Sequence, residues 1–276
     1  MQAQDRLKSD QSRKEDEQPA VFIGHGKPMV AIEYDDWSEH LTAFVERFPP
    51  PVGIVVMSAH WETDNKISIT ASEYPEQVYD FEGYPDTLYY LTYPCMGDPE
   101  LAHEIAERLS DLPIPVELDE SRGLDHGTWI PLYVAYPNAE VPVVQISIPR
   151  NADPKLLFDM GTALSPLRKK GILIIGSGNV AQNLSASNEN KYADVDSSIA
   201  SSDTWFEAAI SAFDLKSLFD YKSKMPGKAK SVEHSHIAPA FFVLGARTQK
   251  DHFVDIHTGF HYSTISMRTF AFTKNR

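Results

Sequence analysis

Short apolar runs that end abruptly in glycine and polar residues are the clearest pattern along the chain. Three of them cover residues 21–26, 53–61 and 171–179. The apolar part of each run is too short for a free-standing helix and is rich in β-branched residues, which is typical of a parallel strand covered on both faces. Ligands bind beyond the carboxyl ends of such strands in open α/β sheets. The polar residues that follow the three runs are therefore expected to share one site.

The rest of the chain alternates between helical and extended patterns. Helices are predicted, from the spacing of apolar residues, over residues 29–48, 98–112, 154–168, 204–213, 218–225 and 234–245. Strands are predicted over residues 66–71 near a sheet edge, 114–118, 141–148 and, as an antiparallel return, 260–272. This order predicts an α/β fold, a single three-layer domain with a mostly parallel central sheet and helices on both faces.

Several segments carry more specific expectations. Residues 188–203 are polar and rich in serine, which indicates a surface loop, and residues 131–136 form a short apolar segment. The last predicted helix contains Pro239, and proline is tolerated in the first turn of a helix. His236 is therefore expected at or just before the N-terminus of that helix.

Composition limits the function classes. The chain has 276 residues and a formal net charge of −14, with no visible basic patch, so nucleic acid is not expected as a partner. No apolar run approaches the roughly 20 residues of a membrane span. A single cysteine, Cys95, fits a reducing compartment, and we expect a cytoplasmic protein. Residues 1–19 have mixed charge and no apolar core, which predicts a disordered tail before a folded domain of residues 20–276.

Four of the ten histidines share a context that surface histidines lack. His25 lies between glycines, His60 at a strand end, His126 between Asp125 and a glycine, and His236 before a helix that contains proline. Each alone is more often structural, but together they indicate a site. Neutral imidazoles suit Fe(II) and Zn(II), and a helix N-terminus keeps a histidine neutral.

Neighbouring residues could support this site. Asp125 could orient His126 or act as a carboxylate behind it, and His234 could lie behind the metal ligands. Residues 74–93 are dense in tyrosine, phenylalanine and proline. Such a segment either covers a pocket for a flat apolar ligand or packs as a loop on the core.

Seven motifs together resemble a known family. They are VFIGHGKPM at 21–29, SAHW at 58–61, YDFEGYP at 79–85, GLDHGTW at 123–129, PVVQISI at 142–148, SGNV at 177–180 and HIAP at 236–239 followed by LGA at 244–246. In this order and spacing they resemble the DOPA-type extradiol ring-cleaving dioxygenases of the class III, protocatechuate 4,5-dioxygenase-like superfamily. The resemblance covers residues 20–272.

The resemblance implies an oxidoreductase that cleaves a catechol-type ring with O2. It implies a non-haem Fe(II), or zinc, held by His25, His60 and His236, with His126 acting in the pocket. Substrate contacts are expected from Trp61, Tyr79 and Phe81. The expected partners are a small aromatic diol and O2, and the expected state is a monomer or small homo-oligomer.

One position departs from the family. Members usually carry a histidine where this chain has Gln182, within the run SGNVAQNL, and the stretch before His236 also differs. An amide cannot transfer a proton as imidazole does, although it can donate a hydrogen bond to oxygen or substrate. Ring cleavage could slow by about 10²- to 10⁴-fold. Two alternatives follow, a metal-binding homologue with lost or altered activity and a zinc hydrolase on the same scaffold.

Overall fold

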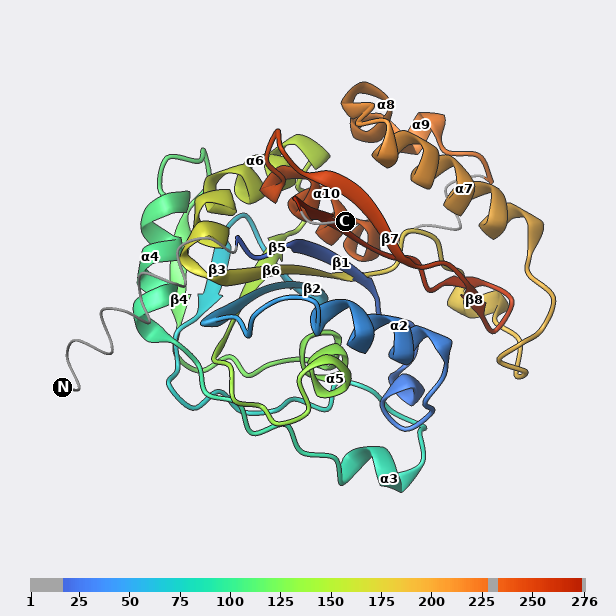
Figure 1. The fold of residues 1–276 in the computed structure, drawn as a ribbon, viewed down its shortest axis with the longest axis horizontal. Coiled ribbons are helices and arrows are strands. Elements are labelled where there is room, and N and C mark those ends of the chain that lie inside the picture. Colours follow the sequence, from blue (N-terminus) through green and yellow to red (C-terminus); the bar gives the residue numbers. More distant parts are fainter. Residues whose placement is uncertain (1–16, 228–232, 275–276) are drawn as a thin grey trace.

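Eight strands form one sheet through the middle of the molecule, with helices packed on both faces (Figure 1). This is a computed structural model, and it describes residues 17–227 and 233–274. The strands are β1 (Ala20–Gly24), β2 (Gly53–Thr63), β3 (Ile67–Thr70), β4 (Val116–Asp119), β5 (Val143–Pro149), β6 (Ile172–Gly178), β7 (His252–His257) and β10 (Thr269–Thr273). Their order across the sheet is β4-β3-β5-β2-β6-β1-β10-β7.

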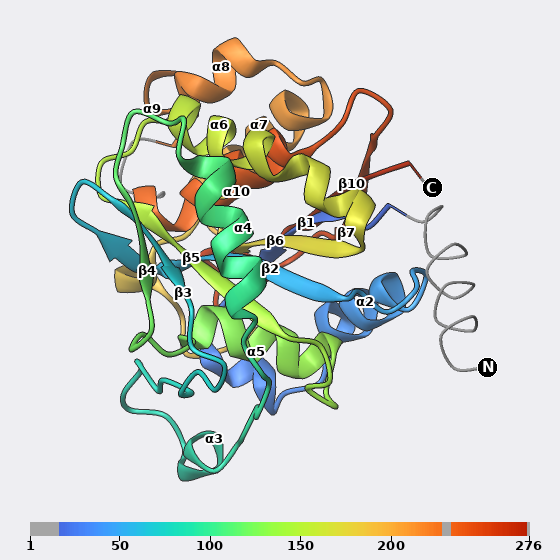
Figure 2. The same ribbon diagram turned by 90° about the vertical axis from the view of Figure 1, so that its left-hand side faces the viewer.

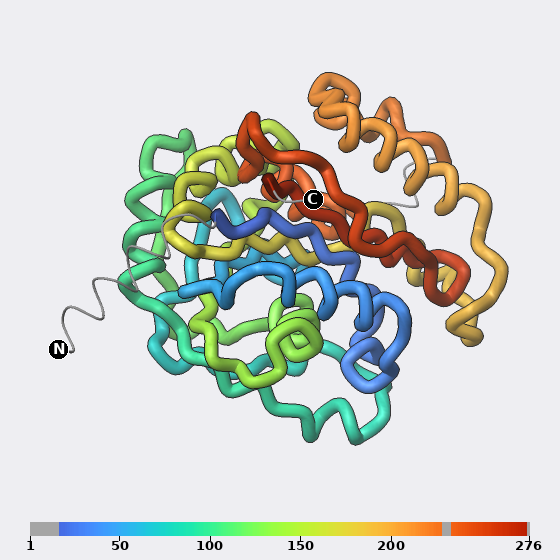
Figure 3. The backbone as a smooth tube through the Cα atoms, in the orientation of Figure 1, coloured from blue at the N-terminus to red at the C-terminus, as the bar shows by residue number. Residues whose placement is uncertain are grey.

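The centre of the sheet is parallel. The pairs β5-β2, β2-β6 and β6-β1 are parallel, as is β3-β4, whereas β3-β5, β1-β10 and β10-β7 are antiparallel. The predicted α/β fold with a mostly parallel sheet is therefore confirmed. Of the antiparallel strand predicted over residues 260–272, only the end forms it, as β10 beside β1, and Figure 3 shows these blue and red segments running side by side. Between β7 and β10 lies a small hairpin of β8 (Phe260–His261) and β9 (Ile265–Ser266).

Helices cover the two faces unequally (Figure 2). One face packs against α4 (Pro99–Leu109), α6 (Pro154–Leu164), α7 (Ser197–Ser211) and α10 (His234–Ala246), and the other against α2 (Asp36–Val45) and α5 (His126–Ala135). In β6, Ile172 and Ile174 join the first core, whereas Leu173 and Ile175 join the second. Both faces of the strand are apolar because both are covered.

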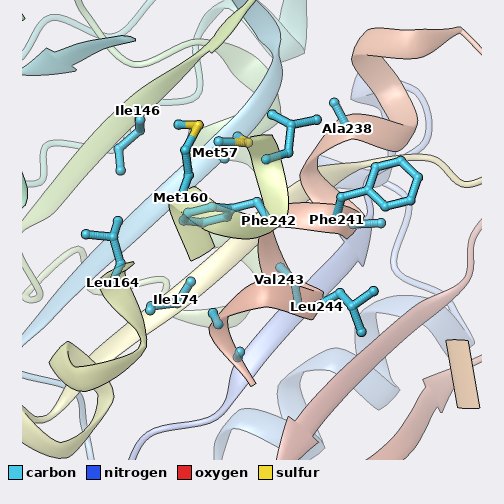
Figure 4. Close-up of a cluster of buried hydrophobic side chains, with 14 of the residues drawn as sticks. Met57, Ile146, Met160, Leu164, Ile174, Ala238, Phe241, Phe242, Val243 and Leu244 are labelled. Carbon is cyan, nitrogen blue, oxygen red and sulfur yellow. The ribbon is translucent and has the colours of Figure 1, made fainter. Parts of the chain in front are cut away.

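Helix α10 is the central helix of the larger core. It is buried from His236 to Ala246, and its side chains pack with those of α6 and β6 (Figure 4). Glycines bring α6 and α10 close together. A Cβ atom on Gly161 would lie 1.9 Å from the carbonyl oxygen of Phe242, and one on Gly245 would lie 1.9 Å from that of Phe158. Any side chain at either position would force the helices apart.

Two local expectations were wrong, and the structure assigns a further segment. Helix α7 begins at Ser197, inside the predicted loop of residues 188–203, because Asp196 caps it by accepting from the backbone N–H groups of Ser198 and Ile199. Pro239 lies inside α10 and not in its first turn. The apolar residues 131–136 belong mostly to α5, which already begins at His126 and tolerates Pro131 inside it.

Short elements complete the chain. They are the 3₁₀ helices η1 (Pro28–Ala31), η2 (Ser165–Lys170) and η3 (Leu184–Ala186) and the helices α3 (Asp86–Tyr89), α8 (Leu215–Phe219) and α9 (Tyr221–Lys224). Within residues 17–227 and 233–274, every helix is too short or too polar to cross a lipid bilayer.

A buried arginine joins segments from both ends of the chain. Arg168 is fully buried and pairs with Asp251, with an Nη1–Oδ2 distance of 2.6 Å. It also donates to the backbone oxygens of Gln18, Ala246 and Phe272. Most of the predicted tail of residues 1–19 lies outside the described residues, but Gln18 is held in the fold by this arginine.

Replacing Arg168 with leucine is expected to lower the free energy of unfolding by about 3–5 kcal/mol, because Asp251 would stay buried without its partner. Urea denaturation measures this change. Arg150→Leu is the matched control, since Arg150 and Asp64 form a pair that is 53% and 75% exposed. The control should lose less than about 1 kcal/mol. Equal losses in the two variants would contradict the role of Arg168.

Candidate active site

The four histidines singled out in the sequence meet in one pocket. His25 follows β1, His60 lies in β2, His126 is the first residue of α5, and His236 lies in the first turn of α10. The pocket has a volume of about 140 Å³, and a cavity of about this size can hold a benzene ring. It is lined by His25, Gly26, Lys27, Pro28, His60, Phe81, Tyr84, His126, Gln182, Leu184 and His236.

The end of β6 fixes the position of His236. Successive strand residues face opposite sides, so Gly176 and Gly178 both face α10. A Cβ on Gly178 would lie 2.1 Å from the carbonyl oxygen of His236, and one on Gly176 would lie 2.4 Å from that of Pro239. The backbone N–H of Asn179 donates to the same carbonyl of His236 at 2.9 Å. The first turn of α10 therefore rests directly on the strand end.

Ser177, between these glycines, faces the other way and sets the tautomer of His25. Its hydroxyl donates to the carbonyl oxygen of Gly127, so its single proton is used. The Nδ1 atom of His25 lies 2.9 Å from the same hydroxyl oxygen and must therefore be the donor. In a neutral His25 ring the remaining nitrogen, Nε2, then carries a lone pair. Burial, together with the neighbouring histidines, holds the pKa of His25 well below its usual value.

Three of the histidines fit a metal ion. One ring nitrogen each from His25, His60 and His236 lies within 4.8 Å of the other two. The Nε2 atoms of His25 and His60 are 3.2 Å apart, close to the roughly 3.3 Å between two nitrogens bound at about 2.0–2.1 Å to one tetrahedral ion. Burial is also the main reason that the pKa of His60 is lowered. Neutral rings with converging lone pairs are the donor set that a divalent metal requires.

His126 is held by Asp80. One carboxylate oxygen of Asp80 accepts from both the backbone N–H and Nδ1 of His126, each at 2.9 Å. Burial opposes the charge on Asp80, but these bonds outweigh it and lower its pKa to about 2. The second carboxylate oxygen lies 3.9 Å from Nδ1 of His60. The Nε2 atom of His126 takes no part in these contacts with Asp80.

Asp125 does not orient His126, contrary to the expectation. It is fully buried and accepts hydrogen bonds from Ser58, at 2.7 Å, and from Gln145. Arg122 lies 3.3 Å from its second oxygen. The backbone of residue 125 precedes α5 in an extended conformation, so its side chain turns into the protein interior. Burial raises the pKa of Asp125.

Gln182 lies in the pocket wall. Its side chain is 2% exposed, and its Nε2 atom has no hydrogen-bond partner among the described residues. His236, and to a smaller extent the amide of Gln182, lowers the pKa of the nearby carboxylate of Glu233. Gln182 and Glu233 nevertheless form no hydrogen bond of good geometry. A buried amide without a partner is costly, and a bound ligand that accepts from it would remove that cost.

The remaining predicted residues lie at different depths. Phe81 lines the pocket with its ring centroid 5.5 Å from that of His126. Tyr79 packs behind it against Trp129, and its hydroxyl donates to the carbonyl of Leu91. Trp61 is buried beneath Arg122. Neither Tyr79 nor Trp61 is among the lining residues. The ring of His234 also lies outside the lining, 3.0 Å from the hydroxyl of Tyr221.

The sequence alone missed several lining residues. Tyr84 and Leu184 line the pocket, as does Lys27, which occupies the turn after His25. Lys27 could have been found from its position between His25 and Pro28 in that glycine-bracketed turn. Asp80 could have been found from the aromatic segment that carries it, but nothing in the sequence pairs it with His126 across 46 residues.

Comparisons with known proteins identify the family of the chain. Residues 16–273 match the family model described as the catalytic LigB subunit of aromatic ring-opening dioxygenase. The chain belongs to this family. It is 34% identical over 262 residues to a 4,5-DOPA dioxygenase extradiol of Beta vulgaris, covering 91% of this chain and 95% of the relative. It is 36% identical to a protein of the same description from Escherichia coli K12, covering 83% and 84%.

A solved structure has the same fold. The crystal structure of an uncharacterized protein from Escherichia coli K12 superposes with a TM-score of 0.80 at 31% identity and covers 93% of this chain and 100% of that one. The expected family, the class of extradiol ring-cleaving dioxygenase and its place among oxidoreductases are therefore confirmed. The identity of the metal and the roles of single residues stay predictions.

Removing the hydroxyl of Ser177 is expected to weaken metal binding. Ser177→Ala leaves Nδ1 of His25 without its acceptor, and loss of such a partner lowers metal affinity by about 10- to 100-fold. Competition for Zn²⁺ against a coloured chelator measures the affinity. Ser185→Ala is the matched control, because Ser185 is exposed and its hydroxyl donates to the Asn183 side chain, away from the histidines. An unchanged affinity in a folded Ser177→Ala protein would contradict the assignment of His25.

Proposed function

We propose that this chain is a non-haem, metal-dependent extradiol dioxygenase that opens the ring of a catechol with O2. The observation that carries the proposal is the pair of Nε2 atoms of His25 and His60, 3.2 Å apart, with His236 beside them at a ring-sized pocket. Three imidazoles suit both Fe(II) and Zn(II) and leave positions open. We favour Fe(II), because zinc has no redox chemistry.

The reaction sets the tasks of the residues. A bound Fe(II) would supply Lewis acidity toward the two hydroxyls of the catechol and a path for electrons from the catechol, which is oxidised, to O2, which is reduced. The carbon–carbon bond beside the diol breaks, and both atoms of O2 enter the product, which is a semialdehyde. The protein must bind the ring, accept a proton from the diol and return it.

His126 carries the proton in this proposal. Asp80 accepts from its Nδ1, so Nε2 of the neutral ring has a lone pair to receive a proton from a catechol hydroxyl. The negative charge of Asp80 then stabilises the imidazolium that forms. The same contact fixes the ring plane, because Asp80 also holds the backbone N–H of His126.

Gln182 would bind oxygen without moving a proton. Its unpartnered Nε2 group can donate to O2 or to a catechol oxygen. The substrate ring would lie against Phe81, with Tyr79 and Trp61 supporting the wall from behind. The amide at position 182, where the family usually has histidine, also favours the alternative of a metal-binding homologue with lost or altered activity.

The proposal extends to the setting of the enzyme. The substrate would be a small aromatic diol taken with O2, and the protein would act as a monomer or small homo-oligomer. The single cysteine, Cys95, is buried, and burial raises the pKa of its thiol to about 11. An unreactive thiol without a disulfide partner fits a reducing, cytoplasmic location.

Oxygen consumption tests the activity. Protein loaded with Fe(II) should consume one O2 per catechol and produce a coloured semialdehyde, whereas metal-free protein should not. An oxygen electrode records the O2 consumed, and an absorbance scan records the semialdehyde. No uptake above the metal-free control would leave the metal-binding homologue, and tightly held zinc with ester turnover would favour the zinc hydrolase.

The pairing of Asp80 with His126 has its own test. Asp80→Asn should lower kcat by about 10²-fold or more, because the amide no longer stabilises the imidazolium. His126→Gln should cost at least as much. The double variant should be no slower than His126→Gln alone, since both changes remove one function. Additive losses in steady-state oxygen uptake would show that Asp80 acts independently of His126.

A further inference from the structure

A positively charged side chain, that of Lys27, lines the pocket beside the histidines. Lys27 follows Gly26, whose φ of +63° turns the chain directly after His25. Its own backbone is extended, with φ −91° and ψ 156°, and η1 begins after it. The side chain of Lys27 is one of the lining groups, and it is the one lysine or arginine among the described residues that line this pocket.

The ammonium of Lys27 has no carboxylate partner within ion-pair distance among the described residues. Its Nζ donates to the hydroxyl of Ser187 at 3.2 Å and lies 4.2 Å from the ring centroid of Tyr262. An ammonium has three donors, so this arrangement leaves donors free. The side chain of Lys27 is half-buried.

The first acidic residues after Lys27 in the sequence, Glu33 and Asp35, are already paired. Lys191 binds Glu33 at 3.1 Å and Asp35 at 2.6 Å. The chain has a net charge of −14, so carboxylates outnumber cationic side chains. A shortage of carboxylates therefore does not explain why Lys27 is unpaired. An ammonium that is partly desolvated and unpaired gains from an anionic ligand.

The pocket limits where such an anion can lie. Its volume of about 140 Å³ is that of a single ring. A ring with its diol toward the histidines fills this space against Phe81 and Tyr84, so a substituent must extend past it toward the solvent. The described lining contains no carboxylate that could receive an ammonium on the substrate.

We infer that Lys27 binds an anionic substituent, such as a carboxylate, on the aromatic diol. This inference rests on the proposed function, because the diol fixes the orientation of the ring. The preferred substrate class is then a catechol with a short side chain that ends in a carboxylate. An amino group on that side chain is not needed for this contact, and the lining residues offer it no carboxylate.

Matched substrates test this specificity. The compounds are 3-(3,4-dihydroxyphenyl)propanoate, the neutral 4-propylcatechol and the zwitterion DOPA, each assayed as kcat/KM for oxygen uptake by the Fe(II)-loaded full-length protein. Wild type should prefer the propanoate over propylcatechol by about tenfold or more, the usual effect of one charge-assisted hydrogen bond. The propanoate should be at least as good as DOPA.

Variants assign the preference to Lys27. In Lys27→Met the ratio of kcat/KM for propanoate to propylcatechol should fall to about one, and Lys27→Arg should keep part of it. Lys66→Met is the matched control, because Lys66 pairs with Glu117 outside the pocket and its loss also removes one positive charge. The control should keep the wild-type ratio.

A binding measurement separates this inference from the proposed function. Calorimetry with the unreactive 3-(4-hydroxyphenyl)propanoate and 4-propylphenol on zinc-loaded protein should show the same dependence on Lys27. If no oxygen is consumed with any catechol, the dioxygenase proposal fails and binding alone decides the role of Lys27. If oxygen is consumed but neither kinetics nor binding changes in Lys27→Met, the anion subsite is wrong and the dioxygenase stands.

Discussion

The close contact between β6 and α10 is the constraint on which the site depends. Gly176 and Gly178 carry no Cβ, so the first turn of α10 can rest on the strand with its carbonyl oxygens against them. That contact brings His236 close to His25, which follows β1, and to His60, which lies in β2. The residue between the glycines, Ser177, faces the opposite side and holds His25. A three-residue strand end thus positions two of the three proposed metal ligands from opposite faces of the sheet.

A second layer of hydrogen bonds determines what each imidazole can do. Ser177 fixes which nitrogen of His25 keeps its proton, and Asp80 does the same for His126. Burial keeps His25 and His60 uncharged, and an uncharged ring is the form that can bind a metal. The histidines that share this pocket therefore have distinct tasks because of their partners, although the residue type is the same.

The sequence was informative where burial on both faces left a simple signature. The apolar runs before His25 and His60 predicted covered strands, and the polar residues at their ends meet as expected. Pairings across long loops were not predictable. Asp80 and not Asp125 holds His126, because the chain between residues 80 and 126 folds back in a way that no local pattern encodes. Pro239 inside α10 and the start of α7 at Ser197 also escaped prediction, since tertiary packing and a single capping aspartate decided them.

The position of β10 has a consequence for biosynthesis. This strand inserts between β1 and β7, and residues 270–272 pair with residues 20–22. During translation, nearly the whole chain must therefore leave the ribosome before β10 can cover the second edge of β1. Such distant pairing slows folding and exposes an unpaired strand edge in the meantime. A nascent chain of this topology is a natural client for molecular chaperones.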